Sequence, residues 1–262
     1  KLQNVSNDEM EKFWPSALHE AGVRDWVIKH ITGGMVKNAY AKFSLVKTPL
    51  GNELTSMNSE IVFSGFNLNY DESFPPITNV SGVANFTKDA MKISITDGTV
   101  LESKVSDSVV AIDDLFAPVT LLKISGRARG NASDGLKHAG YKTAFAGEMK
   151  KYLNGSAISD FDIRIPLKEV IALKDVYVAV NSVISGLNNG YVRGGVMTRT
   201  KKDFRSTNFV TNVDLTAAEL IASAFEIEKK SNVESGLDFV VALKDPTKIR
   251  LRNISLWKKE PK

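Results

Sequence analysis

Cysteine is absent from the 262 residues of this chain. Its absence excludes disulfide bonds, thiol catalysis and zinc sites built on cysteine. Histidine is scarce, and the three that are present, His19, His30 and His138, lack the spacing of metal ligands. The sequence also contains no nucleophile elbow and no Walker-type phosphate loop. We therefore predict that the protein is not an enzyme and uses no metal and no cofactor.

Long apolar runs are missing too, since no segment approaches the roughly 20 residues that a membrane-spanning helix needs. The composition is 43% hydrophobic and 24% charged, which is ordinary for a globular protein. A formal net charge of +4 is too small to require an anionic partner, and we predict no binding to nucleic acid. The chain begins with Lys1 and not with methionine, so we interpret it as a piece of a longer protein.

Two of the three tryptophans lie close together near the N-terminus. Apolar residues recur there at helical spacing between residues 16 and 31, and a glycine pair follows at Gly33-Gly34. This pattern predicts an amphipathic helix inside an N-terminal helical element, residues 1–32. We expect the helix to pack on a β-sheet through Trp14, Leu18, Trp26 and Val27.

From residue 33 to residue 262 the period of the apolar residues changes from 3.6 to 2, which is typical of strands with one wet face. Turn signals such as Asp97-Gly98 and Asn189-Gly190 separate these runs. Two short helices are expected, at 133–141 and at 216–219, where Thr216 and Glu219 have capping-box spacing. The fold class is therefore mostly β: a long bent antiparallel sheet, with the N-terminal helix and one or two short helices.

Glycines early in several β runs, as at Gly82, Gly126 and Gly155, indicate bends or close backbone approaches. A sheet bent repeatedly in one direction becomes an open groove. The alternating apolar residues then either form the core of a closed sandwich or line the floor of the groove, and the residues alone leave both alternatives open. The candidate floor residues are Ile93, Ile95, Phe161, Ile163, Ile165, Val176, Val178, Val180, Phe239, Val241 and Leu243.

Charged pairs offer little chemistry in this sequence. Asp160 and Asp162 fall on the polar side of a strand, and Arg127 and Arg129 share another polar face, so we interpret both pairs as solvated surface. A carbohydrate-acting enzyme on a β scaffold would need a placed acid–base pair, and we find none.

Several segments together resemble the AsmA-like domain of the YhdP type, a family of very long envelope proteins of Gram-negative bacteria. The resemblance spans about residues 13 to 230. The motifs that carry it are, in chain order, Trp14-Pro15 with Trp26-Val27 and Gly33, residues 63–70 followed by Pro75-Pro76, residues 161–167, and residues 212–220.

This resemblance implies a segment of a bridge-like lipid transfer protein, in which the apolar β-groove conducts phospholipid acyl chains between the inner and outer membranes. It further implies a periplasmic location, with attachment to the inner membrane through a segment absent from this chain. The expected partners are phospholipid acyl chains, neighbouring segments of the same long chain and envelope proteins. An alternative function is that of an envelope assembly or structural factor that binds proteins by adding a strand at a sheet edge.

Overall fold

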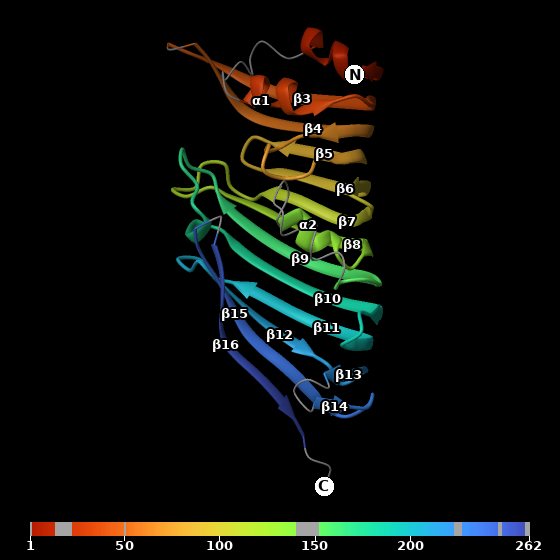
Figure 1. Ribbon diagram of the computed structural model, residues 1–262. Coiled ribbons are helices and arrows are strands. Elements are labelled where there is room, and N and C mark those ends of the chain that lie inside the picture. The colour runs from red at the N-terminus through yellow and green to blue at the C-terminus, as the bar shows by residue number, and fades with distance from the viewer. Residues whose placement is uncertain are drawn as a thin grey trace. The chain divides into compact units, whose positions relative to one another are not determined.

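The computed structural model describes residues 2–13, 23–49, 51–139, 152–222, 227–245 and 248–259. Within these ranges the protein is mostly β, with sixteen strands in open antiparallel sheet and two short α-helices (Figure 1). The predicted fold class is thereby confirmed. The chain divides into two compact units, Lys1–Lys123 and Ile124–Lys262. The predicted division at residue 32 stays a prediction.

Unit 1 is an antiparallel sheet in which most neighbours in space are also neighbours in sequence. The short strand β2 (Ile31–Thr32) pairs with β4, and helix α1 precedes it. The main strand order is β1 (Leu2–Ser6), β3 (Met35–Thr48), β4 (Gly51–Leu68), β5 (Ile77–Thr87), β6 (Met91–Val100) and β7 (Ser103–Ile112).

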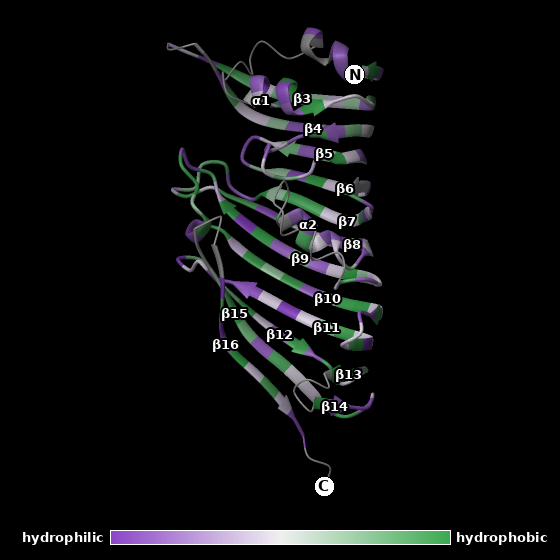
Figure 2. Cartoon of the chain, in the orientation of Figure 1, coloured by the Kyte–Doolittle hydropathy of each residue, from purple (hydrophilic) through white to green (hydrophobic). Residues whose placement is uncertain are grey.

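The core of unit 1 lies on one face of this sheet. Ala84 pairs with Ile61 on one side and with Ile93 on the other, so these three side chains share a face. Period-2 alternation along each strand places the other apolar residues beside them, as Figure 2 shows along the strands. The buried members are Val5, Val36, Phe63, Phe66, Val80 and Ala84.

Unit 2 is built in the same way. Strand β8 (Leu121–Asn131) begins just before the boundary between the units, and the short strand β13 (Ala218–Ala222) pairs with β11 and with β14 (Ile227–Lys229). After β8, the main order is β9 (Ser156–Pro166), β10 (Tyr177–Asn188), β11 (Val192–Lys202), β12 (Asn208–Asp214), β15 (Ser235–Asp245) and β16 (Lys248–Lys258).

The buried core of unit 2 gathers near one end of its strands, around Ile184, Val196 and Leu215. Lys229 lies within this region, and its ammonium group donates to the backbone carbonyls of Leu215 (2.6 Å), Thr216 (3.3 Å) and Ala218. These bonds satisfy the three donors of a buried lysine without a carboxylate. Among the described residues, the members of this cluster are Ala132, Ile184, Leu187, Val196, Leu215, Ala218 and Leu220.

The helices agree with the sequence only in part. Helix α1 (Val23–His30) confirms the described part of the predicted N-terminal helix, and Gly33 and Gly34 follow it with left-handed φ angles of 63° and 66°. Helix α2 (Asp134–Ala139) confirms the second prediction. A 3₁₀-helix, η1 (Asn7–Phe13), follows β1; it lies in the predicted N-terminal helical element, where Asn7-Asp8-Glu9 can cap a helical turn, whereas the sequence pattern did not predict strand β1.

The predicted helix at 216–219 is wrong. Thr216 lies in a turn, and its backbone amide donates to the Asp214 carboxylate at 2.8 Å. Strand β13 begins two residues later, at Ala218. Pairing with β11 and burial of Ala218 and Leu220 in the core outweigh the local helical signal of the capping-box spacing.

Gly82 is a position where only glycine fits. A Cβ atom there would overlap the carbonyl oxygen of Ser94 and lie 3.1 Å from the Cα of Ile95. This close approach of β5 and β6 is the role that the sequence predicted for glycine in these strands.

We expect Gly82→Ala to destabilise unit 1 by about 1–3 kcal/mol, because the two strands must separate to admit the methyl group. Gly98→Ala is the matched control: it lies on β6, and its Cβ would come no closer than 3.6 Å to any atom. Denaturant-induced unfolding measures both. Equal stability of the two variants would contradict the close approach.

Asp214 should make stability depend on pH. Hydrogen bonds from the side chain and amide of Thr216, with weaker attraction from Arg199 and Lys229, lower the pKa of this carboxyl group. A lowered pKa in the folded state stabilises the fold above the ordinary pKa of about 3.9 and loses that effect as pH falls.

Asp214→Asn should therefore be less stable than the parent chain at pH 7, and the difference should shrink at pH 3. Unfolding in denaturant at the two pH values measures this, and Glu228→Gln controls for the loss of one negative charge on β14. A difference that stays constant between the two pH values would show that the charge of Asp214 has no role.

Candidate functional site

Strand register brings the predicted floor residues of unit 2 onto one face. Val178 of β10 pairs with Ile163 of β9, and Val180 pairs with Phe161, so all four side chains point the same way. Ile165 lies two residues beyond Ile163, on the same side.

The same face continues across β12, β15 and β16. Phe209 pairs with Val241, and Val241 in turn pairs with Leu251. Phe239 pairs with Thr211, which lies opposite Thr200 of β11. We call this surface the apolar face of unit 2; its members are Phe161, Ile163, Ile165, Val176, Val178, Val180, Phe209, Phe239, Val241 and Leu251.

The apolar face is only half-buried. Phe161, Ile163, Val178 and Val180 are partly accessible, and none of them belongs to the buried core of unit 2 within the described residues. Every described strand of the unit lies in the one hydrogen-bonded sheet, so no second sheet of the unit packs on this face. Leu243 belongs to β15, but its side chain lies outside the described residues.

The opposite face of the same strands carries more polar residues, although Ile158, Val183, Met197 and Val210 are also exposed on it. Asp160 pairs with Asn181, which pairs with Arg199, and the row continues through Asn212 to Asp238. Asn212 donates to the Asp238 carboxylate at 2.7 Å. The sheet is therefore amphipathic, with water on this side.

The two carboxylates noted in the sequence are surface ion-pair partners on that polar face. Arg127 of β8 donates two hydrogen bonds to Asp160, at 2.6 and 3.0 Å, and these bonds hold the pKa of Asp160 below its usual range. Arg164 binds Asp162 at 2.7 Å. Both carboxylates are thus engaged by arginine, and neither is placed as a general acid or base.

Hydroxyl groups interrupt the apolar face without leaving it unsatisfied. Ser159 and Ser182 are hydrogen-bonded to each other at 2.8 Å, and Thr200 and Thr211 at 3.1 Å. Each of these hydroxyls therefore has a hydrogen-bond partner inside the face.

Lys202 is a member of the face that the sequence did not reveal. It pairs with Val178, yet it is only 1% exposed, and its ammonium group donates to the carbonyl oxygens of Val176 and, at 3.1 Å, of Asp203. The positive charge is thereby turned toward the strand ends and away from the face. A pair of adjacent lysines at the end of a β run gave no signal of this arrangement.

A comparison with known families fits this amphipathic architecture. The family model described as YhdP protein matches residues 1–189 of the chain. This chain belongs to the YhdP family. No curated protein and no solved structure shows significant similarity to it.

The match confirms the resemblance inferred from the sequence. It covers unit 1 and, in unit 2, reaches beyond the end of β10. The resemblance at residues 212–220 lies beyond the match and stays a prediction. The YhdP family is not a family of enzymes. In the part of this YhdP chain that the structure describes, no helix is long and apolar enough to cross a bilayer.

In unit 1, Ile93 and Ile95 lie on the sheet face that carries the core. Both are half-buried, and both pack against the cluster around Phe63 and Ala84. These two predicted floor residues therefore lie beside a buried core, unlike their counterparts on the apolar face of unit 2.

The predicted packing of the N-terminal helix on the sheet stays a prediction. Trp14 and Leu18 lie outside the described residues. Trp26 is 44% exposed and stacks on His30 at 4.8 Å between ring centroids, and Val27 is half-buried. His30 is hydrogen-bonded through Nδ1 to the carbonyl oxygen of Asn69 at 2.6 Å, which gives this histidine a structural role.

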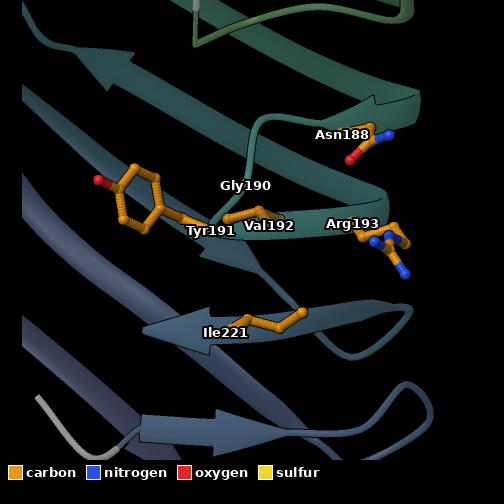
Figure 3. Close-up of a pocket in the computed structure, with 6 residues that line it drawn as sticks. All are labelled: Asn188, Gly190, Tyr191, Val192, Arg193 and Ile221. Atoms are coloured by element: carbon orange, nitrogen blue, oxygen red, sulfur yellow. The ribbon is translucent and has the colours of Figure 1, made fainter. Parts of the chain in front are cut away.

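A shallow depression at the β10–β11 turn offers no catalytic chemistry (Figure 3). Arg193 is its only charged lining residue, and it lies 3.7 Å from the Glu219 carboxylate. Among the described residues no group of three acidic or histidine side chains could hold a metal ion. The lining residues are Asn188, Gly190, Tyr191, Val192, Arg193 and Ile221.

The stability of two valine variants separates an open face from a closed core. Val178 and Val196 lie on the same face of adjacent strands, but Val196 belongs to the buried core. We expect Val196→Ala to cost about 2 kcal/mol and Val178→Ala less than about 1 kcal/mol, since little packing surrounds the second site. Unfolding in denaturant measures both, and equal large costs would show that the apolar face is packed shut.

Proposed function

We propose that this chain is a segment of a periplasmic lipid transfer protein, in which the apolar faces of bent β-sheets conduct phospholipid acyl chains between the inner and outer membranes. The single observation that supports this proposal best is the row Ile163, Val178, Phe209, Val241 and Leu251. With Lys202 as its member on β11, this row crosses unit 2 on a face that no other sheet of the unit covers within the described residues.

The dimensions of the row suit an acyl chain. Strands β9, β10, β11, β12, β15 and β16 follow one another, and neighbouring strands lie about 4.8 Å apart, so the row is about 24 Å long. The hydrocarbon core of a bilayer is about 30 Å thick and holds two leaflets, so one acyl tail occupies roughly half of that. A tail of about 15 Å can therefore lie along the row within its length.

The chemistry of the face suits movement along it. Burying a methylene gains about 0.8 kcal/mol whether it enters a bilayer or an aliphatic protein surface, so transfer between the two is nearly neutral. Ser159 is hydrogen-bonded to Ser182 and Thr200 to Thr211, and the Lys202 ammonium group is bonded to carbonyl groups. No strong polar contact therefore holds the cargo at one point.

The polar opposite face suits contact with water in the periplasm. Membership of the YhdP family supports this location, with attachment to the inner membrane through a segment outside this chain. In this proposal the partners are phospholipid acyl chains, neighbouring segments of the same long chain and envelope proteins. The protein acts on its cargo without chemical reaction, cofactor or nucleic acid.

One observation favours the alternative of strand addition. The described side chains of β16 are all exposed, including Leu251, Ile254 and Trp257, and within the described residues β16 pairs only with β15. An envelope protein that added a strand to this edge would cover its unpaired backbone groups.

A photocrosslinking amino acid placed at Val178 tests the proposal in cells. We expect adducts with phospholipid, detected by mass spectrometry of the purified chain, because Val178 belongs to the apolar row, between Ile163 and Lys202. Asn181, on the polar face of the same strand, is the matched control and should give none.

A second probe position, Leu251 on β16, distinguishes the alternative. Lipid adducts at Val178, whatever Leu251 gives, support transfer. Protein adducts at Leu251 together with no lipid at Val178 would overturn the proposal and favour strand addition.

A further inference from the structure

Two loops at one end of the unit 2 strands expose large apolar side chains. They are the β9–β10 connection, residues 167–176, and the β11–β12 connection, residues 203–207, which lie at the same end of the sheet (Figure 1). Val170 is 75% exposed and Ile171 is 45% exposed. We call these two loops the rim; its exposed apolar residues are Leu167, Val170, Ile171, Leu173 and Phe204.

The rim is held in shape by bonds between its two loops. The Arg205 amide donates to the carbonyl oxygen of Lys174 at 2.6 Å. Lys202 joins the loops as well, because its ammonium group binds the carbonyl oxygens of Val176 and Asp203.

Further side-chain contacts stabilise the two loops. The Asp175 carboxylate accepts hydrogen bonds from the Ala172 amide at 2.9 Å and lies 2.8 Å from the Lys168 ammonium group. Phe204 lies 5.8 Å from Tyr177, centroid to centroid. The exposed apolar side chains are thus carried by loops that hydrogen bonds and ion pairs hold in a defined conformation. Exposed apolar patches of this kind mark interaction sites.

The charge around the rim is positive. Residues 167–176 and 203–207 contain three basic and three acidic side chains, and the exposed Lys201 beside them adds one positive charge, so the net charge of these groups is 4 − 3 = +1. Lys168 is paired with Asp175, and Lys201 with Asp203 at 2.9 Å. The remaining exposed charged residues are Lys174 and Arg205, against Glu169, whereas Lys202 is buried and its ammonium group binds carbonyl oxygens.

We propose that the rim docks on the surface of a bilayer that contains anionic phospholipid. Its five apolar side chains enter the headgroup region, and the surplus positive charge faces the lipid phosphates. Exposed aliphatic and aromatic side chains on tight loops, flanked by basic groups, suit insertion into a membrane surface. They are less suited to binding the edge of a partner's sheet, because such binding requires unpaired backbone groups of a strand.

The rim lies next to the apolar face of unit 2, so docking of the rim on a bilayer bears on lipid transfer. Ile165 and Val176 of the apolar face lie directly next to residues 167–175, so docking would bring that face to the headgroup region of the leaflet. An acyl chain could then pass between membrane and face. The role of docking in lipid transfer rests on the proposed function, whereas binding of the rim to a bilayer does not.

Sedimentation of the 262-residue chain with vesicles tests the proposal. We expect binding to vesicles of phosphatidylcholine with phosphatidylglycerol, and weaker binding to phosphatidylcholine alone. The double variant Val170→Ser, Ile171→Ser should bind the mixed vesicles at least tenfold more weakly, a loss of about 1.4 kcal/mol.

The matched control is Val183→Ser, Val210→Ser. These valines are 50% and 48% exposed, but they lie on the polar face of the sheet, and their replacement should leave vesicle binding within twofold of the parent chain. A third variant, Lys174→Gln, Arg205→Gln, should remove the preference for phosphatidylglycerol. Circular dichroism of each variant checks that it is folded.

The outcomes separate the rim from the proposed function. The rim variant should keep any phospholipid that copurifies with the chain, whereas Val178→Asp should lose that lipid and still bind vesicles. Failure of the parent chain to bind vesicles, or equal binding by the rim variant and its control, overturns the docking proposal. A protein crosslink at Val170 without vesicle binding would identify the rim as a protein-docking site and also overturn it.

Discussion

The antiparallel ladder is the constraint on which the rest of the structure depends. Residues paired across neighbouring strands share a face, and successive residues alternate between faces. The pairing of Ile163 with Val178 therefore determines where Phe161 and Val180 point, and the same pairing puts Asp162 and Arg164 on the wet side. A slip of one residue would exchange the two faces, so the core, the apolar face and the ion pairs all follow from one register.

This constraint also explains how a charged residue can belong to an apolar face. Lys202 occupies a face position by register, and its chain is long enough to carry the ammonium group to the carbonyl oxygens at the strand ends. The register places the Lys202 side chain on the apolar face, and its ammonium group connects two loops through the carbonyl oxygens of Val176 and Asp203. The serine and threonine pairs solve the same problem over a shorter distance.

The local alternation of residues such as Phe161, Ile163 and Ile165 was enough to predict the class of fold and the face on which these side chains lie. Long-range information was not available in the pattern: nothing near Thr216 shows that Ala218 and Leu220 pair with β11 and enter the core, so a capping-box spacing predicted a helix there. Strand β1 was missed because Val5 is its only fully buried residue. The rim was missed because loop residues such as Val170 carry no periodicity.

The off-centre position of the unit 2 core has a mechanical consequence. The buried cluster around Ile184 and Val196 packs the strands together near one end. At the opposite ends the strands are held by backbone hydrogen bonds and by Lys202, which connects two loops. The strand ends beside this cluster should therefore open less often than the opposite ends, because opening them would expose buried apolar side chains to water.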